Sequence, residues 1–131
     1  MAGLIVLDAT VMIAHLDATD AHHDRASALL VAAASEAFMA SPLSLAEVLV
    51  GPTRAGRLAD AVAALEELGV RAVSLDDDAP SRLATLRSET GLRLPDCCVL
   101  LAGEQVGAAV ATFDERLGSA ASRQGLSVRD R

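Results

Sequence analysis

The 131-residue sequence contains no lysine, and all eleven of its basic residues are arginine. Mechanisms that need a lysine nucleophile are therefore excluded, and so are phosphate clamps built on a lysine ammonium group. Any contact with phosphate has to come from arginine or from the backbone.

Cysteine, aromatic residues and long apolar runs are also scarce. The two cysteines, Cys97 and Cys98, are adjacent, which suits neither a disulfide framework nor a zinc site of spaced thiolates, and a reducing cytosol fits them best. Aromatics make up 2% of the residues, so alanine, valine and leucine must fill the core. The N-terminal apolar run stops at Asp8 and is too short for a signal peptide or a membrane helix. We therefore expect a cytoplasmic protein with no membrane partner.

Length and composition are those of one globular unit. The chain is 52% hydrophobic and 22% charged, which argues against intrinsic disorder. We expect residues 1–131 to form a single domain, because this length buries one real core but hardly divides into two. The net charge of −7 argues against a nucleic-acid partner, since phosphate binding usually shows as a basic surplus.

Short apolar segments alternate with helix-like segments, a pattern that predicts a doubly wound α/β domain with a short central parallel sheet. We predict strands over residues 3–7, 37–40, 70–75, 108–112 and 126–128. We predict helices over residues 9–16, 21–35, 42–50, 55–68, about 78–91, 94–106 and about 115–123. Ser41 and Pro42 are typical of a helix N-cap and first helical position, and this helix should end near Gly51-Pro52.

Four acidic residues can converge at one edge of the predicted sheet. Asp8 and Asp114 each follow a predicted strand at its carboxyl end, where ligands of open parallel sheets bind. Asp96 begins the helix that leads to the 108–112 strand, and Glu47 lies on the helix that follows the 37–40 strand. Such a carboxylate cluster needs a cation to offset its repulsion, and Mg²⁺ or Mn²⁺ prefers oxygen ligands. Sites of this type suit phosphodiester cleavage, in which the metal lowers the pKa of a water molecule.

The four acids lie in stretches that resemble a known family. The stretches are Asp8-Ala-Thr10, Ser44-Leu-Ala-Glu47-Val-Leu, Leu94-Pro-Asp96 and Ala111-Thr112-Phe-Asp114-Glu-Arg-Leu117. In order and spacing they resemble the signature stretches of PIN-domain ribonucleases, and the length is most similar to that of VapC-type toxins of toxin–antitoxin pairs. The resemblance covers essentially the whole chain and implies a PIN-like three-layer α/β/α fold and a Mg²⁺- or Mn²⁺-dependent endoribonuclease that hydrolyses RNA.

The resemblance also implies roles for individual residues. Asp8, Asp96 and Asp114 would lie next to the metal, and Glu47 would be a further ligand or the acid that positions the attacking water. Hydroxyl groups that orient the carboxylates would come from Thr10 and Thr112.

Two arginines are candidates for RNA contact, Arg93 and Arg116. Arg116 stands where many relatives carry a further acid, which either weakens a second metal site or supplies a phosphate contact. Several of the negative charges belong to the predicted site, so a bound divalent ion would offset much of the acidic balance. The partners implied are an RNA substrate, a cognate antitoxin, and a second copy in a homodimer that forms a heterotetramer or larger assembly with the antitoxin.

Each acid taken singly also has a structural explanation. Glu47 can close a capping box with Ser44, Asp96 can favour the positive end of its helix, and Asp114 can be a turn or N-cap residue. The Asp76–Asp78 run is explained by helix capping and a solvated face better than by a second metal site.

Other functional classes fit less well. Receiver domains and haloacid-dehalogenase-type phosphatases need a lysine, and nucleotide-binding modules need a glycine-rich phosphate loop that is absent. The alternative that stays open is a catalytically inactive PIN-like protein that acts as a protein- or RNA-binding module.

Overall fold

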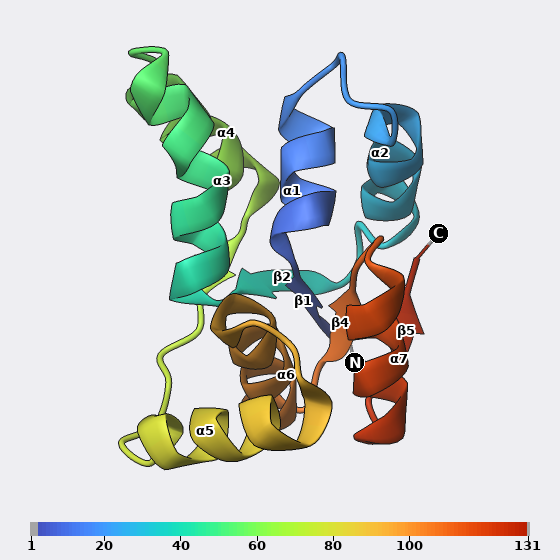
Figure 1. The fold of residues 1–131 in the computed structure, drawn as a ribbon. Helices are drawn as coiled ribbons and strands as arrows, with labels where there is room; N and C mark the ends of the chain where they lie inside the picture. The colour runs from blue at the N-terminus through green and yellow to red at the C-terminus, as the bar shows by residue number, and fades with distance from the viewer. Residues whose placement is uncertain (1–2, 131) are drawn as a thin grey trace.

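The computed structural model describes residues 3–130, which form one parallel sheet covered by helices on both faces (Figure 1). The strands lie in the order β3-β2-β1-β4-β5, and every pairing between neighbours is parallel. Their bounds are Leu4–Leu7 for β1, Ala37–Ala40 for β2, Arg71–Ala72 for β3, Ala109–Ala111 for β4 and Val128–Arg129 for β5. The predicted three-layer α/β/α class with a short parallel sheet is confirmed.

Within residues 3–130, seven helices connect these strands. Their bounds are Ala9–Leu16 for α1, His23–Ala32 for α2, Pro42–Arg54 for α3, Leu58–Leu68 for α4, Ala79–Thr90 for α5, Leu94–Val106 for α6 and Glu115–Arg123 for α7. Side chains of β1 alternate between two hydrophobic cores: Ile5 and Leu7 pack with α1 to α4, and Val6 packs with α5 to α7. Because both faces of β1 are covered, its sequence is a continuous apolar run.

Some element boundaries differ from the sequence predictions. Helix α3 continues through Pro52 to Arg54 instead of ending near Gly51-Pro52. Proline removes one backbone donor here but leaves the later hydrogen bonds possible, and the N–H of Ala55 donates to the carbonyl of Gly51 at 3.1 Å. Strand β3 covers two residues instead of 70–75, since the chain leaves the sheet after Val73, whose N–H still donates to Ala40. Smaller shifts occur at α2, α4 and β5, which begin later than predicted.

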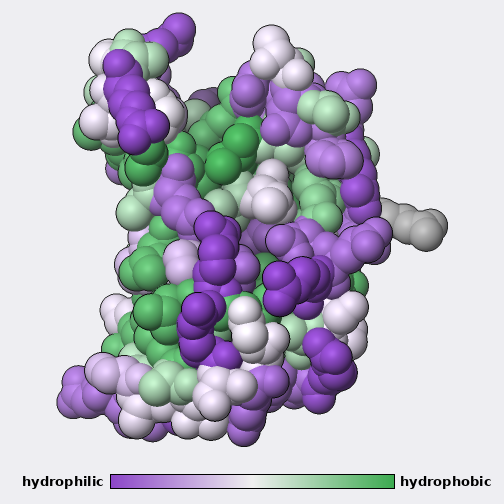
Figure 2. Space-filling model, in the orientation of Figure 1, coloured by the Kyte–Doolittle hydropathy of each residue, from purple (hydrophilic) through white to green (hydrophobic). Residues whose placement is uncertain are grey.

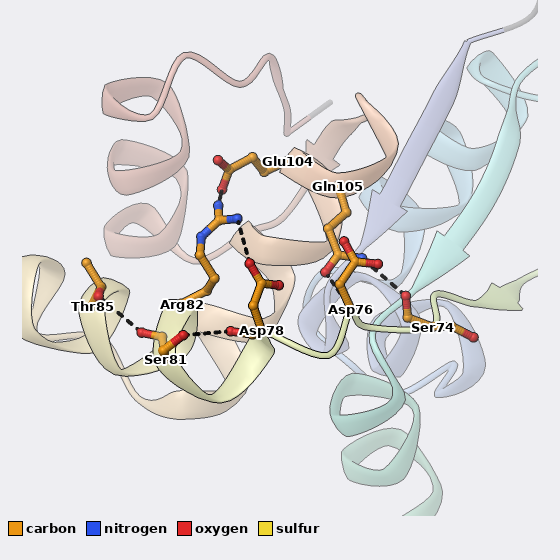
Figure 3. A network of polar contacts seen from close by, with 8 residues as sticks. All are labelled: Ser74, Asp76, Asp78, Ser81, Arg82, Thr85, Glu104 and Gln105. Atoms are coloured by element: carbon orange, nitrogen blue, oxygen red, sulfur yellow. Dashed lines mark hydrogen bonds and ion pairs between the residues drawn. The ribbon is translucent and has the colours of Figure 1, made fainter.

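The Asp76–Asp78 run connects β3 to α5 and is held against α6 by polar contacts (Figure 3). The side chain of Gln105 accepts from the N–H of Asp76 and donates to the carbonyl of Ser74, both at 3.1 Å. Arg82 forms ion pairs with Glu104 at 2.6 Å and with Asp78 at 3.9 Å. All three aspartates are exposed, so the solvated face is confirmed. Asp78 is the N-cap residue of α5, as predicted, but its carboxylate makes no cap hydrogen bond and pairs with Arg82 instead.

Among the helices within residues 3–130, none combines the length and the apolar character needed to cross a membrane.

Candidate active site

Asp8 lies at the junction of β1 and α1, and its side chain is only 3% exposed. Its N–H donates to the carbonyl of Ala111 at 3.0 Å and so continues the pairing of β1 with β4. The Oδ1 atom accepts from the Thr10 hydroxyl at 2.6 Å and from the Val11 N–H at 3.0 Å, which makes Asp8 the N-cap of α1. The Oδ2 atom accepts from the Thr112 hydroxyl. Both oxygens therefore have fixed directions.

The two threonine hydroxyls join Asp8 to the backbone that follows β4. Thr112 donates to Asp8 and accepts from the N–H of Asp114 at 3.0 Å. Thr10 donates to Asp8 and accepts from the N–H of Phe113 at 3.1 Å. The structure thus brings both predicted threonines into contact with the carboxylate that they were expected to orient.

Asp114 and Asp96 each lie at the start of a helix. Asp114 is the N-cap of α7, and its Oδ1 accepts from the N–H of Leu117 at 3.0 Å, so the N-cap reading is correct for this oxygen. Within residues 3–130 its Oδ2 has no hydrogen-bond partner. Asp96 is in the first turn of α6, with a side chain 20% exposed and Oδ2 4.0 Å from Nε of Arg93.

The three aspartates form one electrostatic cluster. Burial raises the pKa of Asp8 above its ordinary value, although its three hydrogen bonds oppose the effect, and the charge of Asp96 raises it further. Burial likewise raises the pKa of Asp96, and the charge of Asp114 adds to that increase. Arg93 and Arg116 act in the opposite direction on Asp96. The two predicted RNA-contacting arginines are therefore close enough to stabilise negative charge at this end of the cluster.

Glu47 comes from an element that carries none of the three aspartates. It is half-buried on α3 and lines a groove of about 800 Å³ that also includes Ile13 and Leu16 of α1. Figure 2 shows a hydrophobic hollow between the end of α3 and α1, with hydrophilic side chains gathered across the centre of the same face. Among residues 3–130, no hydrogen bond or ion pair joins Glu47 to another side chain. The capping-box explanation is wrong, because Ser41 is the N-cap and Ser44 is buried inside the helix.

The donor set suits a cation that keeps water ligands. Within residues 3–130, no three His, Cys, Asp or Glu side chains are close enough to hold a metal ion by themselves. Asp8 has one free lone pair on Oδ2, because its other acceptor positions are filled. The oxygen-only set of Asp8, Asp96 and Asp114 fits Mg²⁺ or Mn²⁺ chemically, since Mg²⁺ usually binds through one or two carboxylates and retains several waters.

A pocket of about 480 Å³ lies beside Asp114, and sequence reasoning missed the side chains of Arg25 and Phe113 that line it. The Cζ atom of Arg25 is 4.4 Å from the centroid of the Phe113 ring. The sequence held one signal for Phe113, since it is one of two phenylalanines and directly precedes Asp114. No local signal pointed to Arg25, which reaches the pocket from α2.

The fold is α/β, and aspartates follow two adjacent parallel strands at their carboxyl ends. These two features place the protein in the class of α/β proteins whose site is built from carboxylates. The family model described as "PIN domain" matches residues 5–122, so the chain belongs to the PIN domain family. The resemblance inferred from the four sequence stretches is thereby confirmed. A comparison with curated proteins gives no significant match.

Solved structures share this fold. VapC20 from Mycobacterium tuberculosis, described as a sarcin-ricin loop cleaving toxin, has a TM-score of 0.71 and 23% identity over 88% of this chain and 94% of that chain. A toxin–antitoxin complex from Klebsiella pneumoniae has a TM-score of 0.71 and 20% identity over 88% of this chain and 90% of that chain. VapBC2 from Rickettsia felis, bound to a promoter DNA fragment, has a TM-score of 0.70 and 12% identity over 96% of this chain and 97% of that chain.

Proposed function

We propose that this protein is a Mg²⁺- or Mn²⁺-dependent endoribonuclease and the toxin of a toxin–antitoxin pair. The observation that carries the proposal is the coupled cluster of Asp8, Asp96 and Asp114 in a PIN domain. The descriptions of the similar structures, which include a sarcin-ricin loop cleaving toxin, favour RNA as the substrate.

In this mechanism carboxylates of the Asp8, Asp96 and Asp114 cluster would hold the divalent ion together with water ligands, and the threonine hydroxyls keep the Asp8 carboxylate in one orientation. When bound, the ion lowers the pKa of a water molecule and stabilises negative charge on the phosphoryl oxygens. Arg93 and Arg116 are beside Asp96, where guanidinium groups can contact a phosphate through two parallel hydrogen bonds.

We assign Glu47 to the orientation of the attacking water and not to direct metal binding. The support for this choice is that Glu47 lines the groove beside α1, whereas Asp114 lines a different pocket. A carboxylate in that position accepts a hydrogen bond from water and can take its proton. Glu47→Gln should then lower kcat while leaving the affinity for Mn²⁺ nearly unchanged. Asp96→Asn should lower both kcat and the affinity for Mn²⁺.

The test is cleavage of a mixed set of structured RNAs by the purified protein, with Mg²⁺ or Mn²⁺ and with EDTA. Asp8→Asn should reduce cutting by about a hundredfold or more, whereas Asp77→Asn, an exposed aspartate in the loop before α5, should leave it unchanged. If the folded wild-type protein neither cuts RNA nor binds Mn²⁺, the inactive binding module becomes the better interpretation.

We also propose an antitoxin partner and a homodimer that assembles with it into a heterotetramer or larger complex. Two of the similar structures are described as a toxin–antitoxin complex and as VapBC2 with promoter DNA, which favours this assembly. Light scattering of the purified chain alone measures homodimer formation. The same measurement after co-expression with a protein encoded next to it measures assembly with the antitoxin. A monomer that captures no neighbouring product would contradict the proposal.

A further inference from the structure

The pocket beside Asp114 lies between α2, α7 and β5. Thr112 and Asp114 line it, so the pocket borders the aspartate cluster. Ser119 and Ser122 of α7 and Arg25 of α2 also line it. Its volume of about 480 Å³ is within the range of roughly 300 to 1,000 Å³ that holds small ligands. We call it the Phe113 pocket after the ring at its base.

The ring of Phe113 is unusual in this chain because it is partly open to solvent. The sequence has no tryptophan or tyrosine and only one other phenylalanine, Phe38, which is 7% exposed in the core. The Arg25 guanidinium lies over the Phe113 ring, and its Nε donates to the carbonyl of Asp130 at 2.9 Å. The His22 ring is 5.4 Å away, centroid to centroid. A flat aromatic and cationic surface is therefore held in place directly beside the candidate active site.

The charges around the pocket argue for an uncharged ligand. Among the described residues 3–130, the acidic residues Asp114, Glu115 and Asp130 line it together with one arginine, Arg25. A phosphate group would meet net repulsion from this set. A nucleobase is neutral, stacks on aromatic rings and on guanidinium planes, and can donate its amino hydrogens to carboxylates.

We propose that the Phe113 pocket binds an unpaired nucleobase of the RNA substrate, next to the phosphodiester bond that is cut at the aspartate cluster. This inference rests on the proposed ribonuclease function. The base stacks on the outer face of the Arg25 guanidinium, which the Phe113 ring supports from below, and the carboxylates of Glu115 and Asp130 accept hydrogen bonds from the base. The pocket therefore prefers adenine, cytosine or guanine, whose amino groups offer two N–H donors, over uracil, whose base offers only the N3–H donor.

A binding experiment tests the pocket without relying on cleavage. A short single-stranded RNA that contains 2-aminopurine is titrated with wild-type protein in EDTA, and the emission of the base analogue reports its stacking. The chain has no tryptophan or tyrosine, so protein emission interferes little. Phe113→Leu, which keeps apolar packing but removes the ring, should weaken binding about five- to 150-fold, and Phe113→Tyr should restore it.

The matched charge variants are Arg25→Gln and Arg71→Gln. Both remove one exposed guanidinium, but Arg71 is on β3 at the opposite edge of the sheet from the pocket. Arg25→Gln should reduce the emission change and Arg71→Gln should not. Equal losses in the two variants would mean a general charge effect and would overturn the proposal.

Mapping the cut sites separates this proposal from the ribonuclease function. With Mn²⁺, Phe113→Leu should still cut RNA but should raise KM more than it lowers kcat and should lose the base preference beside the cut. If its cut sites, KM and emission change match those of the wild type, the pocket proposal fails while the ribonuclease stands. A Phe113-dependent emission change without any cleavage would keep the pocket and overturn the ribonuclease.

Discussion

The hydroxyl of Thr112 serves two partners at once, the buried carboxylate of Asp8 and the N–H of Asp114. Thr112→Val keeps the shape of the side chain but removes the hydroxyl. The Asp8 carboxylate then loses one hydrogen-bond donor, and the N–H of Asp114 loses its acceptor. We expect the free energy of unfolding to fall by about 1 to 3 kcal/mol. Thr112→Ser should lower the free energy of unfolding much less, because serine retains the hydroxyl. Urea denaturation of the three proteins measures the difference, and equal midpoints for Val and wild type would contradict it.

Burial of Asp8 has a consequence for the pH dependence of stability. Its pKa in the folded protein is raised above the ordinary value of 3.8, so the folded state binds more protons than the unfolded state in the pH range just above 3.8. The contribution of Asp8 to stability therefore decreases as pH rises through that range. In EDTA, Asp8→Asn should gain stability relative to wild type between about pH 4 and pH 7. A difference between the two proteins that does not change with pH would contradict this reasoning.

Replacing a glycine by alanine should have opposite effects on stability at two helix positions, one inside α7 and one at the end of α6. Gly118 is inside α7, and a Cβ there would meet Thr112 and Val128 at an ordinary distance of 3.7 Å. Gly118→Ala should stabilise the protein by about 0.5 to 1 kcal/mol through helix propensity. Gly107 ends α6 with φ at 65°, so Gly107→Ala should cost about 1 to 2 kcal/mol. Thermal unfolding measures the change in Tm of each variant relative to wild type. A change of the same sign in both variants would contradict this prediction.

Elements with local signals were predicted well from the sequence. Pro42 and Pro95 mark helix starts, Gly69 and Gly107 mark helix ends, and these signals act within a few residues. The end of α3 was not predicted, because the local effect of a proline does not reveal the hydrogen bonds that remain beyond it.

The candidate site was predicted only in part, for a related reason. Asp8 and Asp114 follow adjacent strands, so the sheet order alone brings them to one edge. The position of Glu47 depends on how α3 is rotated against α1, and the contact of Arg25 with Phe113 depends on how α2 packs. Neither rotation nor packing is encoded in a short stretch of sequence.

For the molecule as a whole, the aspartate cluster should couple metal binding to folding. The carboxylates repel one another in the folded state but are far apart in the unfolded chain, so an ion that binds only the folded state stabilises it. At about a hundredfold excess of Mn²⁺ over its Kd, the gain should be about 2.7 kcal/mol. Differential scanning calorimetry with Mn²⁺ and with EDTA measures this gain. Asp96→Asn should reduce it and Asp77→Asn should not, and an equal gain in all three proteins would place the ion elsewhere.

The pairing of β1 with β4 has a further consequence during synthesis of the chain. Asp8 emerges from the ribosome about a hundred residues before Thr112, which fixes its second oxygen, and before Asp114, which completes the cluster. Domains fold as units, and translation adds about 5 to 20 residues each second. A ribosome-bound fragment that lacks β4 therefore has no assembled site. For the proposed ribonuclease, this order keeps the site unassembled, and the messenger RNA uncut by it, until β4 has been synthesised.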